Sequence, residues 1–518
     1  MKIINYFKLK YFLISLIFCI FAVSFFFYNP SEDAVILFEY SKNFFDKKII
    51  TYSNNVEPTE GATDFLWMII ISFLNYLFPD EYFSSLFLNF ISIILLLVIF
   101  DNQKYKNYLL LFLIISPFMY SSILGFSTMF FTTCYVISIR LYLINSKYLY
   151  FSLLILSLVR PDGVVYGFAL IFAKILKTKE NFKKDLYHLS TFLIIPGLVY
   201  FIARYLYFDN LLPLPFVVKS EEVTDYLFFY KNSVLSSISF FISYFLIIIL
   251  IKLNKNFFSE TIIIFFIPLF FYLTINTTQN IGNRFFSPLI FGFIYFLIFN
   301  LENFKLKKIN YVVFFMLSII ILEIKTTAST LLTLIDSKNE NFYKLSKQLS
   351  EYKGRLLTTE AGKIAYYTNM TVDDAYGLNN NYFAKNVVDE TYLKKKDYDI
   401  FILHCPFDYF QRKNLYGTDK RWPTMCNNIT KFLQDNEQLY DFYLLKYHSY
   451  SYKDNLKNII LKFFNKNVDS NCSRHDIIVL SKKFQNYHNI KNELFNLGAI
   501  EFPYKKNIKL RDDIYCYN

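Results

Sequence analysis

The sequence predicts a polytopic α-helical membrane protein with a C-terminal soluble domain of mixed α/β structure, and three observations support this fold class. Of the 518 residues, 54% are hydrophobic, including 62 Phe and 44 Tyr, more than a soluble protein of this size needs. Apolar runs long enough to cross a bilayer recur from residue 11 to residue 324. From residue 327 onward the composition becomes polar and no further run of that length follows.

The apolar runs predict roughly eleven to thirteen crossings of about twenty residues each. After the first run, which ends at Tyr28, the candidates are 63–79, 83–100, 108–124, 126–143, 187–207, 234–251, 260–275, 285–300 and 309–324. The stretch 148–176 is also apolar but is interrupted by "RPDG", Arg160 to Gly163. The first run has a basic start and a long aromatic core without a clear cleavage site, so we expect a retained anchor.

Basic loops predict the orientation of the chain. The N-terminus and the loops 177–184, 252–255 and 305–308 are rich in Lys and should be cytoplasmic. The loops 29–62, 205–233 and 276–284, and everything after Lys325, then face outward. The net charge of +12 partly reflects this bias and gives no argument for nucleic acid binding. We therefore predict a membrane domain at 1–326 and an extracytoplasmic soluble domain at 327–518.

The soluble domain is expected to contain strands and a disulfide. The segments "YDIFILH" (398–404) and "HDIIVL" (475–480) are strand-like and alternate with helical stretches. Four of the six cysteines are in this domain, in a compartment that permits disulfides: Cys405, Cys426, Cys472 and Cys516. Their spacing does not fit a zinc ribbon, so we expect one or two disulfides, with free buried thiols as the alternative.

The first outer loop begins with two carboxylates, Glu32 and Asp33, directly after the first apolar run. Acidic residues suit the first turn of a helix that begins at Ser31, because the helix dipole favours negative charge there. The spacing of Ala34, Leu37, Phe38, Phe44 and Phe45 predicts that this helix lies in the membrane interface. The functional alternative is a carboxylate that acts on a lipid-borne substrate at the lipid–water boundary.

Four basic residues at other membrane edges are candidates for binding phosphate: Arg160, Arg204, Lys219 and Arg284. Charge at membrane depth is costly and often functional, and the planar fork of arginine suits phosphate. The alternative is that these side chains reach the headgroups from helix ends. The five histidines are scattered, and no Walker loop, G-x-G-x-x-G, G-x-S-x-G or C-x-x-C motif occurs, so nucleotide use and zinc hydrolysis have no support.

Five segments in order resemble the bacterial GT-C glycosyltransferases, in particular the branch that contains the mycobacterial terminal arabinofuranosyltransferase. They are "EDAVILFEYSKNFFDKKIITYSNNVEPTEGATDFLW", "LVRPDG" (158–163), "RYLYFDNLLPLPFVVK" (204–219), "RFFSP" (284–288) and "TTEAGKIAYYTNMTVDDAYGL" (358–378). The resemblance covers residues 32 to 380. Two departures stand out: Asp209 replaces a glycine, and "GFST" (125–128) has Ser127 where the family usually has a glutamate.

The resemblance implies transfer of a sugar, with inversion, from a polyprenyl-phosphate donor to a glycan, lipid or protein acceptor on the outer face of the bacterial inner membrane. It marks Asp33 as the general base, and Glu32 would tune Asp33 or orient the acceptor. Arg160, Arg204, Lys219 and Arg284 would stabilise the leaving phosphate, and Glu60 is counted among the substrate-binding residues. The sequence names no metal ligands, and a divalent cation stays open as a cofactor.

The soluble domain would help to bind the acceptor. Tyr366, Tyr367 and Tyr376 could stack on sugars, with core packing as the alternative. Two other functions stay open: an O-antigen ligase or polymerase, and a lipid-linked glycan flippase or transporter. Ligases more often have a large loop between spans than a C-terminal domain, and transporters of this size usually have two related halves, which this sequence does not show.

Overall fold

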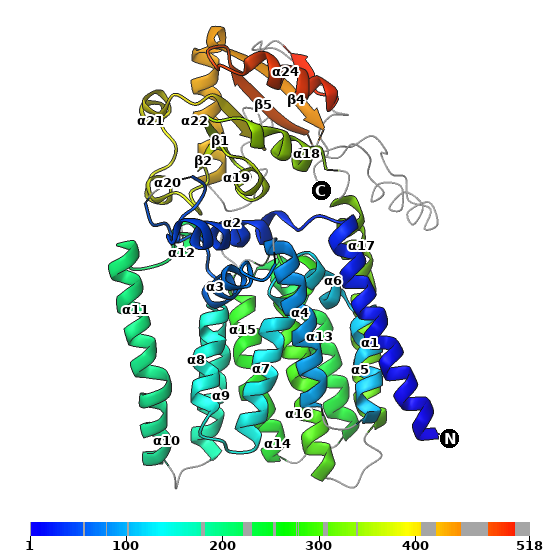
Figure 1. Cartoon of the computed structure of the whole chain (residues 1–518). Helices are drawn as coiled ribbons and strands as arrows, with labels where there is room; N and C mark the ends of the chain where they lie inside the picture. The colour runs from blue at the N-terminus through cyan, green and yellow to red at the C-terminus, as the bar shows by residue number, and fades with distance from the viewer. Residues whose placement is uncertain are drawn as a thin grey trace. The chain divides into compact units, whose positions relative to one another are not determined.

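The computed structural model describes most of the chain and divides it into two compact units (Figure 1). The membrane unit comprises Met1–Asn29, Asp64–Leu206 and Tyr226–Leu334, and the sheet unit comprises Pro30–Thr63, Tyr207–Asp225 and Ile335–Asn518. The described residues are 2–54, 57–78, 80–100, 103–177, 182–220, 230–251, 255–275, 277, 279–303, 309–337, 340–405, 421–446 and 475–502. The predicted fold class, a helical membrane protein with a mixed α/β C-terminal part, is confirmed.

The membrane unit consists of α-helices. They are α1 (Lys2–Phe27), α3 (Phe65–Leu74), α4 (Glu81–Ile99), α5 (Gln103–Ile115), α6 (Pro117–Ile123), α7 (Thr128–Leu143), α8 (Leu149–Val159), α9 (Gly163–Lys177), α10 (Phe182–Leu189), α11 (Ile195–Phe208), α13 (Lys231–Ile251), α14 (Lys255–Thr261), α15 (Ile267–Leu273), α16 (Ser287–Asn303) and α17 (Ile309–Asp336). Helix α7 packs against α4, α8 and α16. Short π-helical turns join α10 to α11 and α14 to α15.

Fewer helices are long enough to cross a membrane than the eleven to thirteen expected. Within the described residues six qualify by length and composition: Leu9–Phe27, Glu81–Ile99, Lys183–Phe208, Ser233–Leu250, Ile281–Asn300 and Asn310–Asp336. The pair α5 and α6, bent by 65°, makes a seventh if it is one span. Several other predicted runs fold as apolar helices of 10–17 residues, including α3, α7 and α8. A count of apolar residues does not detect where a helix ends.

The break at "RPDG" is real and has a local cause. Helix α8 ends at Val159, and Arg160 is extended, with φ −150° and ψ 144°. A residue before proline is disfavoured in the helical region because the proline ring clashes with it, so Pro161 accounts for the end of α8. Helix α9 begins again at Gly163. The chain therefore presents two charged side chains, Arg160 and Asp162, at a gap between two apolar helices.

The sheet unit is built on a six-stranded sheet. Its strands are β1 (Arg355–Thr358), β2 (Thr371–Asp374), β3 (Ile400–Leu403), β4 (Tyr440–Lys446), β5 (His475–Ser481) and β6 (Ile500–Phe502), in the order β2-β1-β3-β5-β4-β6. Strands β2, β1 and β3 are parallel, and the remaining pairs are antiparallel. The strands predicted within 398–404 and 475–480 are thus confirmed as β3 and β5.

Short helices accompany this sheet. They are α2 (Glu32–Lys47), α12 (Leu214–Ser220), α18 (Asn341–Gln348), α19 (Lys363–Tyr367), α20 (Asn381–Lys385), α21 (Glu390–Lys396), α22 (Arg421–Asp435) and α24 (Tyr487–Asn496). One hydrophobic core joins the sheet to α22 and includes Leu357, Phe401 and Val479 from strands and Met425 and Ile429 from the helix. All four residues of β3 are buried, as expected for a strand in the middle of a covered sheet.

The first outer loop belongs to the sheet unit. The hydroxyl of Tyr40 in α2 donates to Asn379 Oδ1 at 3.2 Å and accepts from the amide of Gly61 at 2.9 Å. The side-chain amide of Asn43 donates to Glu39 Oε1 and to two backbone carbonyls of the loop that follows α2. The helix expected in this loop is therefore present. Its placement in the membrane interface stays a prediction, as do the domain division at residue 327 and the orientation of the chain.

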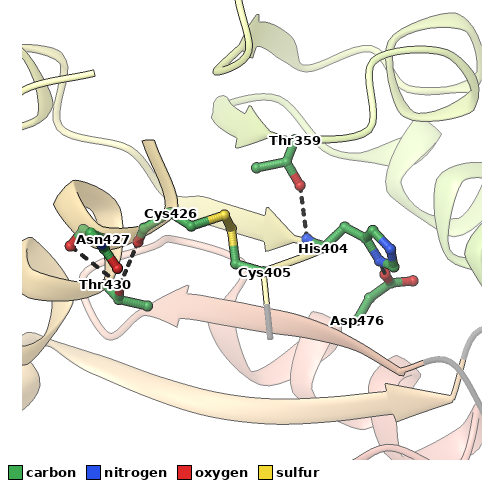
Figure 2. Close-up of a disulfide and its surroundings, with 7 residues drawn as sticks. All are labelled: Thr359, His404, Cys405, Cys426, Asn427, Thr430 and Asp476. Carbon is green, nitrogen blue, oxygen red and sulfur yellow. Dashed lines mark hydrogen bonds and ion pairs between the residues drawn. A yellow bond between two sulfur atoms is a disulfide. The ribbon is translucent and has the colours of Figure 1, made fainter. Parts of the chain in front are cut away.

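The sheet unit contains a disulfide, so the expectation of at least one is confirmed. Figure 2 shows the bond between Cys405, just after β3, and Cys426 in α22, whose Cα atoms are 5.7 Å apart. The other two cysteines of this domain, Cys472 and Cys516, lie outside the described residues. The bond links the end of a central strand to the helix that covers the same core.

Candidate functional site

The sequence-predicted site residues are divided between the two units. The membrane unit holds Arg160, Arg204 and Arg284, and the sheet unit holds Glu32, Asp33, Glu60 and Lys219.

Arg160 is held by a bidentate ion pair. Its Nε and Nη2 donate to the two carboxylate oxygens of Asp162, at 3.0 and 2.9 Å. The hydroxyl of Tyr272, near the end of α15, donates to the same carboxylate. Both charged side chains are largely buried. A buried guanidinium would be costly without a partner, and Asp162 supplies one while leaving Nη1 of Arg160 for a ligand.

The structure brings the two predicted arginines at helix ends together. The guanidinium of Arg160 is 4.8 Å from the ring centre of Phe285, and that of Arg284 is 5.1 Å from the same ring. Arg284 also lies 3.5 Å from the ring centre of Phe126. Stacking on aromatic faces is favourable for a guanidinium and keeps its edge available for hydrogen bonds. Two cations therefore contact the same aromatic ring in the membrane unit.

A carboxylate is present beside Ser127, although the sequence comparison found none at that position. The hydroxyl of Ser127, just before α7, donates to Asp64 Oδ2 at 2.8 Å. Asp64 immediately precedes α3 and lies within electrostatic reach of Arg160, Arg284 and Asp162. The absence of a carboxylate at position 127 itself therefore stands. Asp64 supplies the acid from a different helix.

The resulting cluster contains two arginines and two aspartates, so its formal charges cancel. Ionisable groups at membrane depth are rare and usually face a cavity or pair with one another. The cluster comes from helix ends: Asp64 precedes α3, Ser127 precedes α7, Arg160 and Asp162 separate α8 from α9, and Arg284 precedes α16. The sequence indicates where helices break, and so could suggest single members at helix ends. It does not show which helix ends pack together, so it could not indicate the cluster.

The turn that carries Arg284 is anchored by residues that the sequence reasoning missed. Asn283 has φ 52° and donates through its side chain to Glu323 Oε1 at 2.7 Å. The side chain of Asn280 accepts from the amide of Phe285 at 3.0 Å. Glu323 lies in the apolar helix α17 and is only 2% exposed. The charge of Glu323 within the apolar run 309–324 was the one feature of the sequence that could have indicated this contact.

Arg204 comes from a different helix of the membrane unit, α11. It is 7% exposed on α11, a helix whose other side chains are mostly exposed, and its guanidinium lies 5.7 Å from the ring centre of Phe201. A buried arginine on an otherwise exposed apolar helix differs from the snorkelling expected of a lipid-facing one.

In the sheet unit, Glu32 and Asp33 form the first turn of α2, as predicted. Ser31 is the N-cap but makes no side-chain capping bond. Glu32 Oε1 instead accepts from the backbone amides of Gly362 and Lys363, at 2.7 and 3.0 Å. Burial raises the pKa of Glu32 to about 8, against the smaller opposing effect of the Lys363 charge. Asp33, the next residue, is partly exposed.

Glu60 contacts the first residue of α12, the helix that carries Lys219. The backbone carbonyl of Glu60 accepts from the amide of Leu214 at 3.1 Å, which attaches α12 to the outer loop. Glu60 itself is buried, whereas Lys219 is exposed near the end of α12. Asp209 has φ 53°. This is a left-handed conformation, and aspartate is among the residues that tolerate it.

The motif around 374–379 shapes a loop. Asp374 accepts from the amides of Tyr376, Gly377 and Asn379, and Asn379 in turn accepts from Tyr40 of α2. Tyr366 is buried against Phe38, and Tyr376 packs on Trp422. Both tyrosines therefore take part in packing, and stacking on a sugar stays a prediction.

The sequence reasoning also missed a histidine–aspartate pair where β3 ends and β5 begins. The register of β3 and β5 places His404 opposite Asp476, and His404 Nδ1 lies 2.9 Å from Asp476 Oδ1 (Figure 2). The amide of His404 donates to Thr359 Oγ1 at 2.7 Å. These two residues are 72 positions apart, so no sequence spacing could indicate the pair. Within the described residues, no group of three or more His, Cys, Asp or Glu is arranged to hold a metal ion.

Comparison with known proteins gives little direct guidance. Residues 335–451 match a family model described as "Domain of unknown function (DUF8728)". Among solved structures, "Crystal Structure of ArnT from Cupriavidus metallidurans bound to Undecaprenyl phosphate" is similar with a TM-score of 0.48 and 10% identity, over 79% of this chain and 96% of that chain. At this level the likeness supports no statement about function. No curated protein matches the chain.

Proposed function

We propose that the chain is a membrane glycosyltransferase of the GT-C type. It transfers a sugar from a polyprenyl-phosphate donor to a hydroxyl of a glycan, lipid or protein acceptor, with inversion. The proposal includes a location in the bacterial inner membrane, with the sheet unit outside the cytoplasm. It rests on the ordered motifs between residues 32 and 380 and on the charged groups described above.

The observation that carries the proposal is the place of Asp33. The first candidate span ends at Phe27, and Asp33 lies six residues later in the first turn of α2. Six residues reach at most roughly 20 Å. A partly exposed carboxylate is thereby kept close along the chain to the end of a membrane span. A donor with a lipid tail and an acceptor in water can both reach such a position.

In the proposed reaction, Asp33 accepts the proton of the acceptor hydroxyl. The acceptor oxygen forms a bond to the anomeric carbon while the bond from that carbon to the phosphate oxygen breaks, and polyprenyl phosphate leaves with the electron pair. Fixed cations stabilise the charge that develops on the phosphate. Arg284 and the remaining Nη1 of Arg160 are proposed for this role, with Arg204 and Lys219 as further phosphate-binding groups.

The experiment compares Asp33→Asn with Glu57→Gln. Glu57 is an exposed carboxylate in the same outer loop and serves as the matched control. Purified protein in lipid vesicles is given a panel of radiolabelled polyprenyl-phosphate sugars, and transfer to a hydroxyl acceptor and release of polyprenyl phosphate are measured. Loss of a general base costs roughly 100- to 10,000-fold in rate. We expect that loss for Asp33→Asn and little change for Glu57→Gln.

Two outcomes contradict the proposal. A near wild-type rate for Asp33→Asn leaves Asp33 as a helix-start residue only. Movement of the intact donor across the bilayer, with no cleavage of the sugar–phosphate bond, identifies a flippase instead. Mass spectrometry of the carrier lipids that accumulate when the chain is deleted from its cell then identifies the sugar.

A further inference from the structure

The start of α2 is joined to the loop between β1 and α19 by unusually close contacts. Glu32 accepts two backbone hydrogen bonds from this loop, and the hydroxyl of Tyr52 donates to the carbonyl of Ala361. A Cβ atom added at Gly362 would lie 2.0 Å from the backbone oxygen of Glu32. Only glycine allows this approach. The outer loop that carries Asp33 therefore contacts the loop between β1 and α19 through both Glu32 and Tyr52.

The charges around Glu32 do not favour its ionised form. The ammonium group of Lys363, which lowers the pKa of Glu32, already forms a buried ion pair with Glu340. Glu340 and Glu360, which lies in the loop between β1 and α19, each add negative charge near Glu32. Glu32 Oε2 is buried and has no hydrogen-bond partner among the described residues. The carboxyl groups of Glu340 and Glu360 thus oppose the ionisation of Glu32, because neighbouring carboxyl groups near a buried position do not all ionise cheaply.

We infer that Glu32 is a positioning residue that holds the first turn of α2, and with it Asp33, against the 360–363 loop by acting as an uncharged hydrogen-bond acceptor. It is not a second base. This inference rests on the proposed function only for the role of Asp33. The contact itself is a property of the sheet unit that can be measured without any substrate.

The stability of the contact between Glu32 and the 360–363 loop should depend on pH. The folded unit holds the Glu32 proton up to about pH 8, whereas an opened loop would release it near the ordinary pKa of 4.5. The raised pKa means that the contact contributes fully below pH 4.5 and loses stability as the pH rises from there to about 8. Because one proton is released on opening, the ratio of closed to open loop falls by up to tenfold per pH unit in this window. Lys363, Glu360, Glu340 and Tyr52 are the other titratable groups that act on Glu32 or are acted on by it.

Hydrogen exchange tests the contact directly. The amides of Gly362 and Lys363 are followed in full-length protein in vesicles at several pH values between 5 and 9, after correction for intrinsic exchange. In wild type, protection should fall with pH up to about 8 and then level off. In Glu32→Gln, whose amide oxygen accepts the same two bonds but does not titrate, protection should not depend on pH. Glu57→Gln should behave as wild type.

The sugar-transfer assay separates the roles of the two acids. Glu32→Gln should keep activity within a few-fold of wild type, whereas Glu32→Ala should lose activity together with protection at 362 and 363. An equal loss in Glu32→Gln and Asp33→Asn, with protection intact in both, overturns the inference, because Glu32 would then act as a base. A wild-type pH dependence of protection in Glu32→Gln also overturns it. Full activity of Asp33→Asn with titrating protection at 362 and 363 would remove the proposed function and leave the contact standing.

Discussion

Reduction of the Cys405–Cys426 bond should destabilise the sheet unit by about 3 kcal/mol. The two cysteines are 21 positions apart. In the chain-entropy model a loop of this length, once opened, returns about 3 kcal/mol of conformational freedom to the unfolded chain. For a unit of 150–250 residues, each kcal/mol shifts the midpoint of thermal unfolding by roughly 2–4 °C. The expected shift is therefore roughly 6–12 °C.

The two tryptophans allow the shift to be assigned to one unit. Trp422 lies in α22, four positions before Cys426, and packs against the core of the sheet unit, whereas Trp67 is buried in α3 of the membrane unit. In a Trp67→Phe background the emission of Trp422 alone reports unfolding. Melting is compared with and without a membrane-permeant reductant, and the Cys19→Ser, Cys134→Ser variant controls for the two cysteines that are free within the described residues.

An unchanged midpoint of Trp422 after complete reduction, verified by alkylation of both cysteines, would refute the entropy argument. A Cys405→Ala, Cys426→Ala variant should melt near the reduced wild type and should not respond to reductant. If the variant melts much lower, lost packing in the core accounts for the difference, since both side chains are buried.

Two further substitutions follow from the contacts described. Gly61→Ala should destabilise the sheet unit by about 1–3 kcal/mol because its Cβ would lie 2.0 Å from Asn379 Oδ1; the Trp422 melting curve measures this, and Gly197→Ala, with no atom within 4 Å of its Cβ, is the control. The Arg160→Lys variant cannot keep a bidentate pair with Asp162. We therefore expect its KM for the donor to rise about tenfold, with a smaller change in kcat. An equal effect from Arg140→Lys would show that the loss is not specific.

The sequence predicted the parts of the fold that depend on local pattern. The strands β3 and β5 were found because each is a short apolar run, and α2 was found from acidic residues after an apolar segment. Within the described residues, fewer helices have the length and composition of a span than the crossings expected, because hydropathy measures how apolar a run is and not whether its helix continues. The run at 126–143, for example, folds as α7 with 16 residues, below the length that qualifies as a full span.

The candidate site was predicted as single residues, without their partners. Arg160 and Arg284 could be singled out because charge in an apolar stretch is costly, but their meeting at Phe285 depends on the packing of helices far apart in the chain. The partners of Glu32 are 330 and 331 positions away. Backbone amides carry no sequence signal, so reasoning from residue types did not find these two contacts, and the role of Glu32 toward Asp33 stays a prediction.

The ion pair with Asp162 limits how a phosphate could bind Arg160. Two of the Arg160 donor nitrogens, Nε and Nη2, face Asp162, which is also held by Tyr272. A ligand that displaced Asp162 would leave an aspartate buried beside a tyrosine without its cation, at a cost of several kcal/mol. A ligand that bound Nη1 would leave the pair intact. Asp162 therefore fixes the direction from which Arg160 can be approached, and the aspartate of "RPDG" matters to the site as much as the arginine before it.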